Sequence, residues 1–172
     1  MGTHSFTIVL DRQPTDSELD ELFSIGCDDA AFGTEGGVPT AEFDREAPDL
    51  ANAIASAVRA LEWVHLSPLR VVDQDLLTLA DMAHRVGQSR ESIRRYTQGS
   101  RGPGGFPPPV NPARDGTTFY RWSEAAPWFT RHLGVDVADS DSTLVAANLI
   151  LQARRLRDRV PNVAALVDLL TK

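Results

Sequence analysis

The chain has 172 residues, of which 42% are hydrophobic and 24% charged, and its net charge is −7; these values are ordinary for a folded protein with one large or two small domains. Cys27 is the single cysteine, which excludes an internal disulfide and a cysteine-rich zinc site, and the scattered histidines show no metal-ligand spacing, so we expect no cofactor. No apolar run approaches the roughly 18 residues of a membrane span and the N-terminus has no signal-peptide pattern, so we expect a cytoplasmic protein.

Residues 1–76 have the pattern of a small α+β domain. Apolar runs, helix caps and glycine turns predict a strand at 5–10, a helix that begins at Thr15, strands at 28–34 and 38–44, a helix at 49–62 and a strand at 63–72. This order is typical of a ferredoxin-like (βαββαβ) domain, in which one antiparallel sheet carries two helices on one face. The same segment holds 15 acidic and 4 basic residues.

Residues 77–97 predict two short helices joined by a tight turn. Thr78 can cap the first helix, with Asp81 as its capping-box partner. Gly87 tolerates the positive φ that such a turn requires. Ser89 is a good N-cap for the second helix, whose apolar side chains recur on one face. The residues expected on its outer face are Arg90, Glu91, Arg94 and Arg95.

The run LADMAHRVGQSRESIRRY, followed by a Gly/Pro-rich segment and FYRWSE, resembles the MerR-type and excisionase-type winged helix-turn-helix domains of bacterial regulators. Residues 79–83 look like the opening of that family's first helix, and residues 87–89 look like its turn. The resemblance covers residues 77–133 and implies a domain at 77–134 whose second helix and wing contact double-stranded DNA. The implied contacts are Ser89, Arg90, Glu91, Ser92, Arg94 and Arg95 on the helix and Arg114 and Arg121 on the wing.

The chemistry of these side chains suits DNA. The N-terminal residues of the second helix of a helix-turn-helix reach base edges in the major groove. Arginine can bind guanine through two parallel hydrogen bonds, while serine hydroxyls and the helix N-terminus can bind phosphate oxygens. Residues 77–134 hold 8 basic and 4 acidic residues, so the positive charge of this acidic protein gathers in the segment expected to bind DNA.

The expected wing departs from a usual one because Pro107, Pro108 and Pro109 cannot donate to a strand ladder. The first wing strand should therefore begin near Val110, with residues 111–116 as the loop and residues 117–122 as the return strand. Ser123 should then cap a further helix that runs through Leu133.

Residues 135–172 predict a helix at 143–159, a break at Pro161 and a last short helix at 163–170. This C-terminal helical segment is the most economical place for a homodimer contact. Its four arginines at 154, 155, 157 and 159 favour a dipole-matched helix end or a dimer interface over a second DNA site.

The favoured hypothesis is a sequence-specific DNA-binding transcriptional regulator that acts as a dimer and joins the nucleoid when bound to DNA. The alternative is an antitoxin or adaptor whose acidic residues 1–76 bind a cationic protein, with or without autoregulation through DNA. A small ligand sensed by the N-terminal domain is a third hypothesis, drawn from fold analogy. No nucleophile, base and orienting group can be named, so we do not expect an enzyme.

Overall fold

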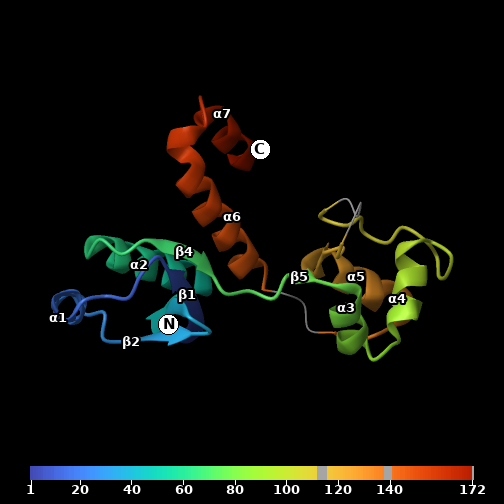
Figure 1. The fold of residues 1–172 in the computed structure, drawn as a ribbon, viewed down its shortest axis with the longest axis horizontal. Helices are drawn as coiled ribbons and strands as arrows, with labels where there is room; N and C mark the ends of the chain where they lie inside the picture. The colour runs from blue at the N-terminus through green and yellow to red at the C-terminus, as the bar shows by residue number, and fades with distance from the viewer. Residues whose placement is uncertain (112–115, 138–140, 172) are drawn as a thin grey trace. The chain divides into compact units, whose positions relative to one another are not determined.

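The computed structural model describes residues 1–111, 116–137 and 141–171, and it has mixed α+β secondary structure with small antiparallel sheets (Figure 1). The chain divides into two units, which we call the sheet unit (residues 1–72 and 146–172) and the helical unit (residues 73–145). The sequence predicts domains at 1–76, 77–134 and 135–172. The main difference is that residues 146–172 cluster with the N-terminal residues instead of standing apart.

The N-terminal part of the sheet unit has its elements in the expected order. They are β1 (Gly2–Leu10), α1 (Asp16–Ser24), β2 (Ala30–Glu35), β3 (Val38–Ala47), α2 (Leu50–Trp63) and β4 (Pro68–Val71). The strands form one sheet in the order β2-β3-β1-β4, and every neighbouring pair is antiparallel. Thr15 and Glu18 make the predicted capping box at the start of α1. The fourth strand is shorter than predicted, because only residues 68–71 of the expected 63–72 pair with β1.

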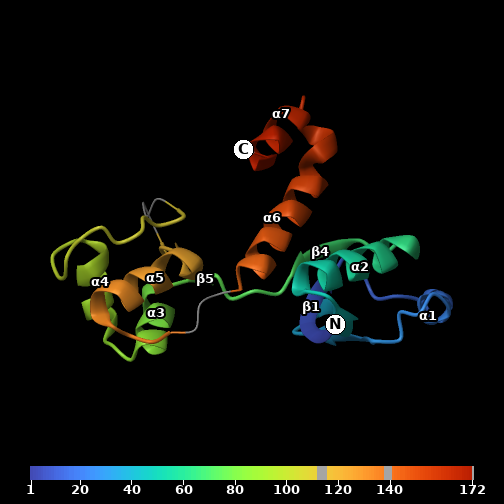
Figure 2. The same ribbon diagram turned by 180° about the vertical axis from the view of Figure 1, so that it is seen from behind.

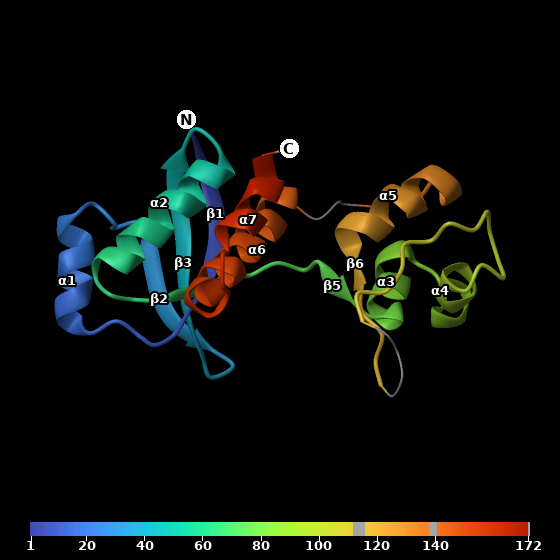
Figure 3. The same ribbon diagram turned by 90° about the horizontal axis from the view of Figure 1, so that it is seen from above.

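One face of the sheet packs against α2, which crosses β1 and β3 in the view of Figure 3 and contacts β4 as well. The buried side of α2 follows the predicted amphipathic stripe, with Ile54, Val58 and Leu61 almost fully buried. Phe6 and Phe43 lie opposite each other on β1 and β3, with ring centroids 5.3 Å apart. Each such buried side chain contributes roughly 1.5–3 kcal/mol to stability.

A helix near the C-terminus of the sheet unit provides hydrogen-bond partners for the backbone at the free edge of β4. This helix, α6 (Ser142–Leu156), holds Asn148 against Val71. The Asn148 amide donates to the Val71 carbonyl oxygen at 2.7 Å, and its oxygen accepts from the Val71 N–H at 2.7 Å. The side chain therefore replaces the next strand at an edge that would otherwise expose unpaired backbone groups.

The chain continues from α6 through η1 (Arg157–Arg159), α7 (Ala164–Val167) and η2 (Asp168–Thr171). The predicted helix 143–159 thus ends at Leu156 and tightens into a 3-10 turn. None of the helices in the described ranges is both long and apolar enough to cross a bilayer.

The helical unit contains the predicted pair of short helices. Its elements are β5 (Leu76–Leu77), α3 (Leu79–Val86), α4 (Arg90–Thr97), β6 (Tyr120–Arg121) and α5 (Trp122–Leu133). Figures 1 and 2 both show α5 beside α3 and α4. The three helices share one core, in which Met82, Ile93 and Phe129 are fully buried.

Aromatic side chains anchor the glycine- and proline-rich segment that follows α4. Phe106 packs edge-on against Tyr120, Trp128 and Phe129, with ring centroids 5.9, 4.9 and 5.5 Å away. The indole N–H of Trp128 donates to the carbonyl oxygen of Gly104 at 3.0 Å. A segment with little secondary structure of its own is therefore held by the core of the unit.

The described part of the predicted wing forms little strand, and residues 112–115 of its expected loop lie outside the described residues. The Val110 N–H donates to the Phe119 carbonyl oxygen at 2.9 Å, but no residue of 106–111 or 116–119 belongs to a strand. The return strand is reduced to Tyr120–Arg121, and it pairs with Leu76–Leu77 rather than with the proline-rich segment. The return strand differs from the prediction because strand pairing depends on residues distant in sequence, here Leu76 and Leu77, and not on local propensity.

Candidate nucleic-acid interface

The turn between α3 and α4 is built by local capping. Thr78 and Asp81 make the predicted capping box at the start of α3, and Gly87 ends that helix in the left-handed conformation at φ 65°. Ser89 then accepts a hydrogen bond from the Ser92 N–H at 3.1 Å, which opens α4. Three residues therefore separate the helices, and each predicted cap of this segment is confirmed.

Helix α4 has one buried and one solvent face. Ile93 and Tyr96 are buried at 0% and 3% exposure, and Tyr96 lies 5.5 Å from the Trp128 ring, centroid to centroid. The predicted outer residues, Arg90, Glu91, Arg94 and Arg95, are all exposed. The division follows from helical periodicity, because residues three apart share a face and the polar ones between them are left in water.

Glu91 organises two of the exposed arginines. It accepts two hydrogen bonds from Arg94, at 2.6 and 2.7 Å, and a third from Arg95 at 3.1 Å. These hydrogen bonds lower the pKa of Glu91 to about 2, with Arg94 as the main cause, so the carboxylate stays charged at neutral pH. Arg94 also donates to the side-chain oxygen of Gln98 at 2.7 Å. The guanidinium group of Arg94 therefore has one orientation on the outer face of α4. Because this group is exposed to solvent, it can exchange Glu91 for another hydrogen-bond acceptor.

Arg90 and the two serines occupy the N-terminal turn of α4. Within the described part of the chain Arg90 has no hydrogen bond or ion pair, and its side chain is exposed. The Ser89 hydroxyl donates to the Ser92 oxygen at 3.0 Å. Arg101 donates to the same Ser92 oxygen at 3.0 Å.

Arg101 is a member of this surface that the sequence pattern missed. It lies after α4, in a segment without helical periodicity, so only the fold brings it back to the helix. Its guanidinium sits over the Tyr96 ring, 5.2 Å from the centroid, a cation–π contact that fixes its direction. The α4 surface, defined as Ser89, Arg90, Glu91, Ser92, Arg94, Arg95 and Arg101, thus carries four arginines against one glutamate.

Of the two predicted wing arginines, the structure describes Arg121, which is paired with Asp75 and does not join the α4 surface. Arg121 donates to Asp75 at 3.1 Å, and Asp75 is buried at 1% exposure. Asp75 also accepts from the Ser123 N–H at 2.7 Å, and so it caps α5 in place of the predicted Ser123 side chain. Arg114 lies outside the described residues.

The α4 surface offers two kinds of hydrogen-bond donor. The helix N-terminus and its serines suit an anionic oxygen, and the arginines suit either a phosphate or the O6 and N7 acceptors of guanine. Among the residues described, no three His, Cys, Asp or Glu side chains gather as metal ligands would. Comparison of the chain with protein-family models, with curated proteins and with solved structures finds no match in any of the three.

Proposed function

We propose that the helical unit is a winged helix-turn-helix domain of the MerR-like or excisionase-like kind, and that the protein is a sequence-specific DNA-binding transcriptional regulator. The observation that carries this proposal is the division of α4, which buries Ile93 and Tyr96 and leaves Arg90, Arg94 and Arg95 in solvent. This is the arrangement that a recognition helix needs in a major groove. The proposed role is binding rather than catalysis.

In this proposal the operator DNA must either displace the Glu91 carboxylate from Arg94 or contact that carboxylate directly. Arg94 leaves Glu91 to bind guanine through its fork, and the freed carboxylate can accept from a cytosine amino group. Arg90, in the first turn of the helix, is suited to reach a base edge, while Ser89 and Arg101 are suited to bind the phosphates that set the register of the helix. Arg114 and Arg121 stay in the proposal as wing contacts, although Arg121 would share its guanidinium with Asp75.

We also propose a ferredoxin-like fold for the N-terminal part of the sheet unit. The βαββαβ element order and the strand order β2-β3-β1-β4 with antiparallel neighbours support this assignment.

A homodimer is part of the proposal, with the C-terminal helices as the contact. Seven apolar side chains on α6, α7 and η2 are 49–77% exposed, namely Leu149, Ile150, Leu156, Leu166, Val167, Leu169 and Leu170. Such a group is unusual for a segment that remains in water. Sedimentation that finds a strict monomer at micromolar concentration would refute the dimer.

The proposal is tested by selecting bound fragments of genomic DNA and titrating the best one by fluorescence anisotropy at two salt concentrations. Arg94→Ala should cost about 1–3 kcal/mol in specific binding if Arg94 reads a base. Arg131→Ala is the matched control, because Arg131 is an exposed arginine on α5. An affinity no greater than for random DNA, or equal losses in both variants, would overturn the proposal.

The second candidate is an antitoxin or adaptor that binds a cationic protein through the sheet unit. Glu42, Asp44 and Glu46 alternate along β3 and are all exposed. They share the sheet face opposite to Phe43, away from the packed side. A pull-down with a Glu42→Gln/Glu46→Gln variant tests this candidate, which requires that the wild type retains a basic partner and the variant releases it.

A further inference from the structure

Glu91 is the single acidic residue of the α4 surface, and it lies on the face that is proposed to meet DNA. It belongs to the first turn of α4, and its side chain is 50% exposed. A carboxylate in this place repels the phosphate backbone of DNA. Its presence on a DNA-binding face therefore calls for a physical reason.

Glu91 partly neutralises the two arginines that follow it by one helical turn. Arg94 donates two hydrogen bonds to the Glu91 carboxylate, at 2.6 and 2.7 Å, and Arg95 donates a third at 3.1 Å. Residues three and four apart share a face of a helix, and an acidic residue that precedes its basic partner is the favourable order. Two arginines and one glutamate leave these three side chains with a net charge of +1.

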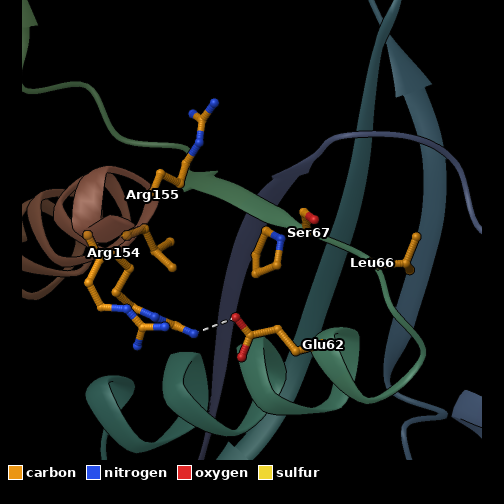
Figure 4. Close-up of a pocket in the computed structure, with 8 residues that line it drawn as sticks. Glu62, Leu66, Ser67, Arg154 and Arg155 are labelled. Atoms are coloured by element: carbon orange, nitrogen blue, oxygen red, sulfur yellow. Dashed lines mark hydrogen bonds and ion pairs between the residues drawn. The ribbon is translucent and has the colours of Figure 1, made fainter. Parts of the chain in front are cut away.

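These ion pairs contribute little to the fold. All three side chains belong to α4 and are about half exposed, and exposed pairs of this kind stabilise proteins weakly. The pair between Arg154 and Glu62 differs, because it joins α6 to α2 within the sheet unit (Figure 4). The Glu91 pairs connect no two elements, so their effect should be found in binding rather than in stability.

A DNA phosphate must compete with Glu91 for these arginines. A new arginine–phosphate contact releases a counterion from DNA, which raises affinity about fivefold at 150 mM salt and about 15-fold at 50 mM. Arg94 and Arg95 lose this gain, because each must leave a carboxylate that then stays unpaired beside the phosphates. A matching site removes the penalty, since Arg94 can bind guanine while the freed carboxylate accepts from a cytosine amino group.

We propose that Glu91 suppresses the binding of the α4 surface to DNA of non-matching sequence, by holding Arg94 and Arg95 in ion pairs that only a matching base sequence replaces. This inference rests on the proposed function, because it requires that the α4 surface faces DNA. Discrimination between sequences then depends on a repulsive group as well as on attractive ones.

The inference is tested on the full chain with random-sequence duplex DNA, titrated by fluorescence anisotropy at 50 and 150 mM salt. Glu91→Gln keeps the size and the helix propensity of the side chain. It should bind random DNA about fivefold more tightly at 150 mM and about 15-fold more tightly at 50 mM, which is the gain from one added phosphate contact. Its preference for the best selected fragment over random DNA should fall by a similar factor.

Glu62→Gln is the matched control, because it also removes an exposed carboxylate and releases an arginine, but in the sheet unit. Its affinity for random DNA should stay within about twofold of wild type, well below the gain from one phosphate contact. In an Arg94→Ala/Arg95→Ala background, Glu91→Gln should also change this affinity by no more than about twofold, since neither arginine is left for Glu91 to hold. The substituted side chains are all exposed, so circular dichroism should show every variant folded.

An unchanged or weaker affinity of Glu91→Gln for random DNA would overturn the inference. An equal gain in Glu62→Gln, or in the background that lacks both arginines, would overturn it as well, because the effect would then come from net charge alone. The proposed function fails by a different result, namely a wild-type protein that prefers no fragment over random DNA. In that case the titrations with random DNA still decide whether Glu91 restrains the two arginines.

Discussion

Asp75 is expected to be a main determinant of the stability of the helical unit. Its side chain is 2% exposed; it accepts from Arg121 at 3.1 Å and from the Ser123 N–H at 2.7 Å. It therefore joins the residues before α3 to the start of α5, which carries Trp122 and Trp128 into the core. Asp75→Ala removes the carboxylate and leaves both donors without this partner.

The expected loss can be worked from the two interactions. An N-terminal cap is worth about 1 kcal/mol, and a hydrogen bond to a charged group about 1.5–3 kcal/mol. Arg121 is 30% exposed, so water compensates part of its loss, and the total should be about 2–4 kcal/mol. For a unit of this size that corresponds to a fall in Tm of roughly 10–25 °C. A double-mutant cycle of Asp75→Asn and Arg121→Gln should give a coupling of about 0.5–3 kcal/mol.

Tryptophan fluorescence in urea is the appropriate assay. Trp122 and Trp128 are buried in the helical unit, whereas Trp63 of the sheet unit is 69% exposed, so the signal reports mainly on the helical unit. Asp136→Ala is the control, because it removes an exposed carboxylate from the same unit. A loss below about 0.5 kcal/mol for Asp75→Ala, the range of ordinary surface substitutions, would refute the role assigned to Asp75.

Three further predictions concern the edge of β4, a glycine and a carboxylate. Asn148→Ala should cost about 2–4 kcal/mol in urea denaturation followed by circular dichroism, because two buried backbone groups of β4 lose their partner; an unchanged midpoint would contradict this. Gly102→Ala should destabilise the helical unit more than Gly104→Ala does, since both glycines have φ +78° but only at Gly102 would the new Cβ meet a tyrosine ring at 3.1 Å; equal losses would count against a packing role. The lowered pKa of Glu91 means that its ion pairs stabilise the protein above pH 4.5 and are lost as the pH falls from 4.5 toward 2; NMR titration should find a midpoint near 2 that rises toward 4.5 in Arg94→Ala, and a wild-type midpoint near 4.5 would reject the network.

Local patterns determined most of the secondary structure. Both predicted capping boxes form, and Gly87 takes the left-handed conformation, because these features depend on residues within one turn of each other. The outward face of α4 was predictable for the same reason, since helical periodicity decides it once Ile93 and Tyr96 are buried. The return strand was expected at 117–122, but the observed strand covers only residues 120–121 and pairs with residues 76–77. Its partner was not predictable, because strand pairing is decided by distant residues and not by local propensity.

The tertiary structure alone decided the partners that are distant in sequence. Asn148 lies 77 residues from Val71, and Asp75 lies 46 residues from Arg121; no periodicity or motif connects either pair. Arg101 joins the α4 surface only because the aromatic core holds its irregular segment beside Tyr96. The sequence by itself therefore determined which helices form and which side chains they offer to solvent. Packing decided which of those side chains are engaged within the fold, because burial and pairing depend on contacts that close only when the whole unit folds.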